Sequence, residues 1–88
     1  MTTITPVQNR FLYEVANEIK SDWPSANDPR HPAGHYVNAM GELRYITDDY
    51  YADDARTVVL YFLSNARSWR GPVAQRVKKE LKALCGLR

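Results

Sequence analysis

The chain has 88 residues, of which 44% are hydrophobic and 25% are charged, and its net charge is +2 at pH 7. This length predicts one domain that folds without disulfides, and the balance of apolar and charged residues excludes an intrinsically disordered chain. The longest apolar run, residues 58–63, is far shorter than the roughly 20 residues of a membrane-spanning helix. With one cysteine and no pattern of a secretory signal at the start, we expect a cytoplasmic protein that contacts no membrane.

Charge is distributed unevenly along the chain. Residues 67–88, the basic C-terminal helical segment, hold seven of the twelve Lys and Arg and one acid, so their net charge is about +6. Residues 42–54 hold five acids and one Arg. We therefore expect two electrically different surfaces, which affect both the partners that the protein attracts and the rate of association.

The first predicted helix runs from about Pro6 to Trp23. Thr5 can cap it, Pro6 suits the first helical position, and Gln8 completes a capping box. Apolar residues then recur at helical spacing as far as Trp23. Residues 24–34 contain three prolines and a glycine, which predict an irregular Pro-rich loop.

Residues 35–47 fit two structures. A turn former followed by glycine at residues 38–41, and the alternation of side chains after it, favour a β-hairpin with a short loop. The apolar residues also fit a helical spacing: Tyr36, Val37, Met40 and Leu43. We favour the hairpin, which must pack against the helices because an isolated hairpin is only marginally stable.

Two further helices follow. Side chains from Thr47 to Asp49 can cap a helix that runs from about residue 50 or 52 to Ser68. Pro72 opens the last helix at its first position, and Gly86 can end it as a C-terminal cap. We expect the apolar stripes of all three helices to meet in one core.

The predicted fold class is therefore α+β. We expect one small domain, residues 1–88, made of three helices with a β-hairpin between the first and second helix. If residues 35–47 are helical, the alternative is an all-α fold.

The last helix carries a basic face opposite its apolar stripe. Arg76, Lys78, Lys79 and Lys82 lie on this face, with Gln75 among them. None of the three lysines has an acid four residues before it that could pair with it along the helix. Such a face can contact a phosphate backbone or an acidic protein surface, or it can be a solvated face that answers the helix dipole.

Leu60 and Tyr61 fall on the polar side of the second predicted helix. Apolar residues at such a place are either covered by another element, here the hairpin, or serve as interface anchors. Together with the basic segment they give the predicted partner-binding residues: Leu60, Tyr61, Arg67, Arg70, Gln75, Arg76, Lys78, Lys79 and Lys82.

Catalysis and metal binding have little support. The chain lacks the nucleophile and phosphate-loop motifs of common enzymes, and Cys85 falls on an apolar stripe where buried, unreactive thiols are usual. His31 and His35 have the spacing of zinc ligands, but Pro32 interrupts the helix between them and no third ligand is close. The acids of residues 48–54 lack the spacing of a calcium loop. We therefore predict no enzyme, no cofactor and no metal site.

In size, single-domain build and lack of catalytic residues, the chain resembles in type the small accessory proteins of phages and other mobile elements, including anti-CRISPR inhibitors, which act by occupying a partner's surface. We expect a monomer or homodimer that docks onto another protein or a protein–nucleic-acid complex. The alternative is a small DNA- or RNA-binding regulator that uses the basic last helix, because helix, Gly-containing turn and helix are the outline of a helix-turn-helix.

Overall fold

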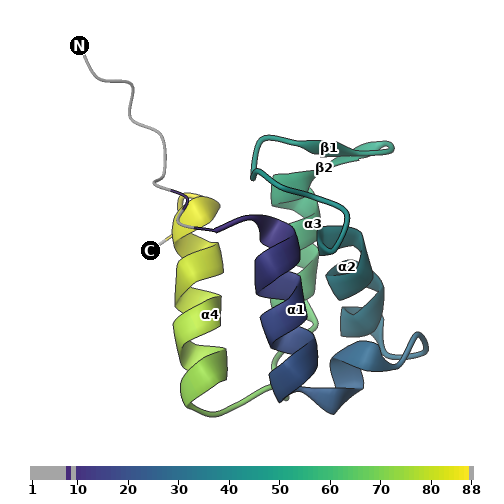
Figure 1. Cartoon of the computed structure of the whole chain (residues 1–88), viewed down its shortest axis with the longest axis vertical. Helices are drawn as coiled ribbons and strands as arrows, with labels where there is room; N and C mark the ends of the chain where they lie inside the picture. Colours follow the sequence, from purple (N-terminus) through teal and green to yellow (C-terminus); the bar gives the residue numbers. More distant parts are fainter. Residues whose placement is uncertain (1–7, 9, 88) are drawn as a thin grey trace.

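The computed structural model describes residues 8 and 10–87. Its elements, in chain order, are α1 (Leu12–Asp22), the 3-10 turn η1 (Pro24–Asn27), α2 (Pro32–Met40), β1 (Asp49–Tyr50), β2 (Asp53–Asp54), α3 (Ala55–Ser64) and α4 (Pro72–Leu84). Figure 1 shows α4 at one edge, α1 in the middle, α2 and α3 on the other side, and the hairpin at the upper end of α3. This part of the chain is mainly helical with one small hairpin, so the α+β class holds loosely. The predicted number of three helices is wrong, because α2 is a fourth.

Helix α1 begins later than the sequence predicted. The expected start at Pro6 lies outside the described residues, whereas Gln8 and residues 10–11 are described and are not helical. The N–H groups of residues 12–13 donate to the carbonyl oxygens of residues 43–44, each at 2.9 Å. Because a distant loop satisfies the first donors of the helix, α1 needs no further turn before Leu12.

The predicted Pro-rich loop contains ordered helical structure. Pro24 opens η1 and Pro32 opens α2, each at the first helical position, where the missing N–H of proline costs nothing. Residues 32–34 thus belong to α2. The imidazole Nδ1 of His31 caps this helix by accepting from the N–H of Ala33 at 3.1 Å.

The hairpin predicted over residues 35–47 is wrong, and the helical alternative is right as far as Met40. The reason is packing: Val37, Ala39 and Met40 are buried in α2 against the other helices, and Leu43 is buried in the turn that follows. A helix of this spacing buries those apolar side chains together, which a hairpin would divide between two faces.

The hairpin lies instead at residues 49–54, where Asp49 pairs with Asp54 and Tyr50 with Asp53. It leads directly into α3, whose cap is Asp54 and not the predicted group at residues 47–49. The carboxylate of Asp54 accepts from the N–H of Thr57 at 2.7 Å, so α3 starts at Ala55. It ends at Ser64, four residues before the predicted end.

Helix α4 matches the sequence prediction at both ends. Pro72 is its first residue, and Gly86 adopts the left-handed conformation with a φ of 79°. The N–H groups of Gly86 and Leu87 donate to the carbonyl oxygens of Ala83 and Lys82 at 3.1 and 2.8 Å. These two hydrogen bonds form the Schellman motif that a C-terminal glycine favours.

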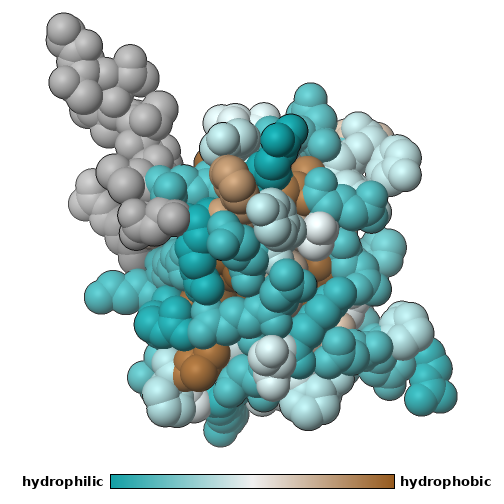
Figure 2. All heavy atoms as spheres, in the orientation of Figure 1, coloured by the Kyte–Doolittle hydropathy of each residue, from teal (hydrophilic) through white to brown (hydrophobic). Residues whose placement is uncertain are grey.

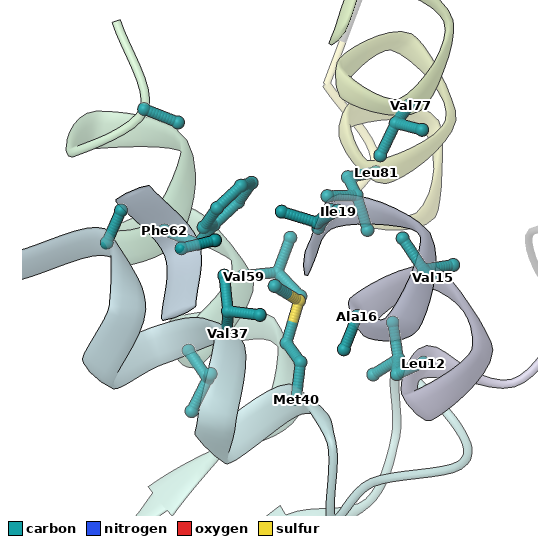
Figure 3. Packing of buried hydrophobic residues seen from close by; sticks show 14 of the residues in the cluster. Leu12, Val15, Ala16, Ile19, Val37, Met40, Val59, Phe62, Val77 and Leu81 are labelled. Atoms are coloured by element: carbon teal, nitrogen blue, oxygen red, sulfur yellow. The ribbon is translucent and has the colours of Figure 1, made fainter. Parts of the chain in front are cut away.

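The three predicted helices share one hydrophobic core, as expected, and α2 contributes to the same core. Figure 3 shows Val77 and Leu81 of α4 pointing toward α1, and Phe62 of α3 on the opposite side of the same core. Leu63 of α3 contributes less to this core, because its side chain is only partly buried. At one end of the core, the Trp23 and Trp69 rings stack with centroids 5.8 Å apart. None of the helices in the described residues is long and apolar enough to span a bilayer.

Candidate functional site

The predicted partner-binding residues occupy two separate regions. Arg67 and Arg70 lie in the connection between α3 and α4, next to the basic residues of α4, and all of them except Lys78 are exposed. Leu60 and Tyr61 lie on α3. The face of the molecule in Figure 2 is mainly hydrophilic, with isolated apolar side chains between the polar ones. Most of the basic residues are similarly exposed, so they differ mainly in the contacts that each side chain makes.

Arg76 is held by an ion-pair network that joins α1 to α4. Its guanidinium binds the carboxylate of Glu18 on α1. Glu18 also binds Arg10 at 2.7 Å, and Arg10 donates two hydrogen bonds to Glu80 at 2.8 and 3.1 Å. The hydrogen bond from Arg76, with that from Arg10, holds the pKa of Glu18 below its usual value. The charge of Arg76 is therefore largely compensated by contacts within the protein.

Lys78 supports the fold. Its Nζ donates to the carbonyl oxygen of Trp69 at 2.6 Å and lies 5.9 Å from the centre of the Trp69 ring. Burial lowers the pKa of Lys78, and the neighbouring cations Lys82 and Arg70 lower it further. Lys78 thus fixes the connection between α3 and α4 against the first turns of α4, and its ammonium group is not free on the surface.

Lys79 and Lys82 differ from both. They are exposed, and neither forms an ion pair within residues 8 and 10–87. They border a groove of about 490 Å³ that we call the α4 groove, lined by Gln75, Lys78, Lys79, Lys82, Ala83 and Leu87. Ala83, Leu87 and the aliphatic stems of the lysines give it an apolar floor, while the ammonium groups stay at the rim.

Sequence reasoning did not include Ala83 and Leu87 among the site residues. Leu87 follows the Gly86 cap, is 41% exposed and lines the α4 groove. The Schellman motif was the available signal, because it folds the residue after the glycine back beside the last turn of the helix.

Leu60 and Tyr61 lie apart from the α4 groove. The predicted cover, a hairpin at residues 35–47, does not exist. Leu60 is partly buried against the core, whereas Tyr61 is 48% exposed and its ring lies 5.4 Å from the ring of Tyr36 in α2. Tyr61 and the partly buried Tyr36 therefore form a second surface, which is aromatic and lies between α2 and α3.

The histidines and the cysteine have structural surroundings. His31 caps α2, and its ring forms a T-shaped contact with the ring of Trp23, with centroids 5.2 Å apart. His35 is exposed beside Tyr36. No group of three His, Cys, Asp or Glu that could hold a metal ion is found in the described part of the chain. Cys85 is buried, and burial raises the pKa of its thiol.

Comparisons of this chain with protein families, with curated proteins and with solved structures find no match.

Proposed function

We propose that the protein is a small non-catalytic binding protein that docks onto another protein, or onto a protein–nucleic-acid complex, through the α4 groove. One observation carries the proposal: an apolar groove bordered by Lys79 and Lys82, which form no ion pair in the described residues. Apolar side chains of a partner would fill the floor, and its carboxylates would meet the two lysines. The apolar contact supplies affinity, and the charges supply orientation and rate of encounter.

In this proposal the protein acts in the cytoplasm as an inhibitor of the kind that phages and mobile elements encode, comparable in type to anti-CRISPR proteins. Support comes from its size and from surroundings of the histidines and Cys85 that offer no pair of catalytic groups. A protein of this kind acts by covering a surface of its target, which requires one docking face and no chemistry.

The alternative, a helix-turn-helix regulator that binds DNA or RNA, has less support. The connection between α3 and α4 spans residues 65–71, whereas the motif joins its helices with about 3 or 4 residues. Arg76, near the start of α4 where base edges would be read, is bound to Glu18. An apolar floor also suits a protein partner better than a phosphate backbone, which rewards closely spaced cations.

The test is capture of partners by the tagged protein from a lysate of its native host. The informative variant is Lys79→Glu with Lys82→Glu, since both side chains are exposed and neither supports the fold. We expect the parent to capture a protein after nuclease treatment, and the variant to retain roughly tenfold less of it. Arg30→Glu is the matched control, because its side chain is 90% exposed and lies outside the groove.

Two outcomes contradict the proposal. If the double variant captures the same proteins as the parent, the α4 groove is only a solvated surface. If the parent captures nucleic acid without any protein, and this capture falls steeply with salt, the nucleic-acid alternative holds, because release of counterions gives that binding its salt dependence.

A further inference from the structure

The hairpin presents one aromatic side chain almost entirely to solvent. Tyr51 is 88% exposed at the tip, in the two-residue loop between Tyr50 and Asp53. Its φ is 54°, a conformation for which glycine is the usual choice at the first position of such a loop. Because most of its side chain stays in solvent, burial within its own chain offsets little of the cost of this conformation, which favours a role in an external contact.

The base of the hairpin is fixed on the protein. Tyr50 packs against the core, and its hydroxyl donates to the Glu42 carboxylate at 3.4 Å. The ring of Tyr51 meets the ring of Tyr50 edge-on, with centroids 4.8 Å apart. The Tyr51 ring is therefore supported from one side and open on the other, which lowers the entropy cost of an external contact.

Two exposed acidic residues lie two positions before and two positions after Tyr51 in the sequence. Asp49 and Asp53 are exposed, and neither forms a side-chain hydrogen bond or ion pair within residues 8 and 10–87. The neighbouring acids are used by the fold: Asp48 accepts from two backbone N–H groups, and Asp54 caps α3. The hairpin thus carries an exposed aromatic ring at its tip and two exposed carboxylates, one on each face of the two-stranded ribbon.

The hairpin complements the α4 groove in charge, and its exposed ring suits an apolar floor. The groove, of about 490 Å³, has an apolar floor and Lys79 and Lys82 in its lining, and the hairpin offers one exposed ring with the carboxylates of Asp49 and Asp53. A tyrosine beside lysine ammonium groups also gains a cation–π attraction. Figure 1 shows the tip pointing away from α4, so a tip cannot reach the groove of its own chain.

We propose that the hairpin tip of one copy docks into the α4 groove of a second copy, with Tyr51 in the groove and Asp49 and Asp53 beside Lys79 and Lys82. Because tip and groove are different surfaces, the contact is heterologous, and copies can add to one another in sequence. Self-association would cover the groove that we assign to the partner. The inference does not depend on that assignment, since it is measured on the pure protein.

The first test is the mass of the pure protein in solution, measured by sedimentation equilibrium between about 0.01 and 1 mM at low salt. We expect the average mass to rise above the 10.1 kDa of one chain with concentration, and to fall back at high salt because the ion pairs are exposed. A mass of one chain at every concentration and salt overturns the proposal.

The second test exchanges the charges. One variant carries Asp49→Lys and Asp53→Lys, and the other carries Lys79→Glu and Lys82→Glu. Each variant alone places like charges on tip and groove, so each should stay monomeric. An equal mixture restores opposite charges at both kinds of contact and should associate. If either variant self-associates as the parent does, or if the mixture stays monomeric, the proposed contact is wrong.

The third test removes the ring by Tyr51→Gly, with Tyr61→Gly as the matched loss of an exposed ring elsewhere. Glycine suits the positive φ at residue 51, so this variant should fold at least as well as the parent, as a thermal melt will show. We expect Tyr51→Gly to weaken self-association about tenfold and Tyr61→Gly to leave it unchanged. If the parent and Tyr51→Gly associate equally, the ring takes no part in the contact and the proposal is wrong.

Discussion

At Gly34, helix α2 lies close against the backbone of the segment before it. A Cβ added at Gly34 would overlap the carbonyl oxygen of Asp28 and would lie 3.2 Å from that of Ala26. Both oxygens belong to the backbone and cannot rotate away. The absence of a side chain at this position therefore allows α2 to pack against η1.

We expect Gly34→Ala to lower the free energy of unfolding by about 1 to 3 kcal/mol, the usual cost of overpacking. Urea unfolding followed by circular dichroism measures it. Gly41→Ala is the control, since Gly41 has an ordinary helical φ of −63° and a Cβ there would meet the Asn38 carbonyl oxygen at 3.2 Å without any overlap like that with Asp28, so its effect should be smaller. If both substitutions have the same small effect, α2 does not approach the turn before it as closely as the structure shows.

At the residue scale, the sequence revealed which cations share a face but not which of them are engaged. Spacing along α4 placed Arg76, Lys78 and Lys82 on one side of the helix. The partners of Arg76 and Lys78 come from distant positions: Glu18 lies on α1, and the carbonyl oxygen of Trp69 precedes α4. Pairing rules for residues three or four positions apart along one helix cannot detect such contacts. The prediction from sequence therefore treated the basic residues as equivalent.

At the scale of elements, prediction succeeded where local chemistry decides the structure. Pro72 and Gly86 fix the ends of α4 through backbone geometry, and the structure confirms both. Residues 35–47 were misjudged because a short apolar run fits both periods, and packing against α1 and α3 selects the helix. The hairpin at residues 49–54 lacks the Asn-Gly or Gly signal of a tight turn, since Tyr51 occupies the position with positive φ.

Phe62 tests the role of α3 as the centre of the core. Its side chain is fully buried, and its ring lies 6.5 Å from that of Trp23 and 6.2 Å from that of Trp69. We expect Phe62→Ala to cost about 3 to 5 kcal/mol and to leave much of this small domain unfolded. A thermal melt compared with that of Tyr61→Ala, the exposed neighbour, measures the difference. A melting temperature within a few degrees of the parent would contradict the central position of α3.

At the scale of the whole molecule, charge does two different things. In the network of Arg10, Glu18, Arg76 and Glu80, opposite charges from α4, α1 and the segment before α1 meet and hold these parts together. The exposed lysines of the α4 groove and the carboxylates of the hairpin stay in solvent, and the two groups lie on opposite sides of the molecule. Net charge alone conceals this division, because the chain as a whole is only +2.

The network predicts how stability changes in acid. Hydrogen bonds from Arg76 and Arg10 lower the pKa of Glu18 in the folded protein, so in acid the unfolded chain binds its proton first. The stability due to Glu18 is thus fully present above the pKa of the unfolded chain, and it is lost as the pH falls below about 5 and through the lower pKa of the folded state. Glu18→Gln removes that contribution at every pH.

We therefore expect Glu18→Gln to be less stable than the parent by roughly 1 kcal/mol at pH 7, because the network is partly exposed to solvent. The difference should shrink toward zero as the pH approaches 2. Urea unfolding of both proteins at several pH values measures this convergence, and Asp53→Asn controls for the loss of one exposed carboxylate. A stability difference that stays constant from pH 7 to pH 2 would mean that Glu18 acts by packing, and that the two helices are not joined by its charge.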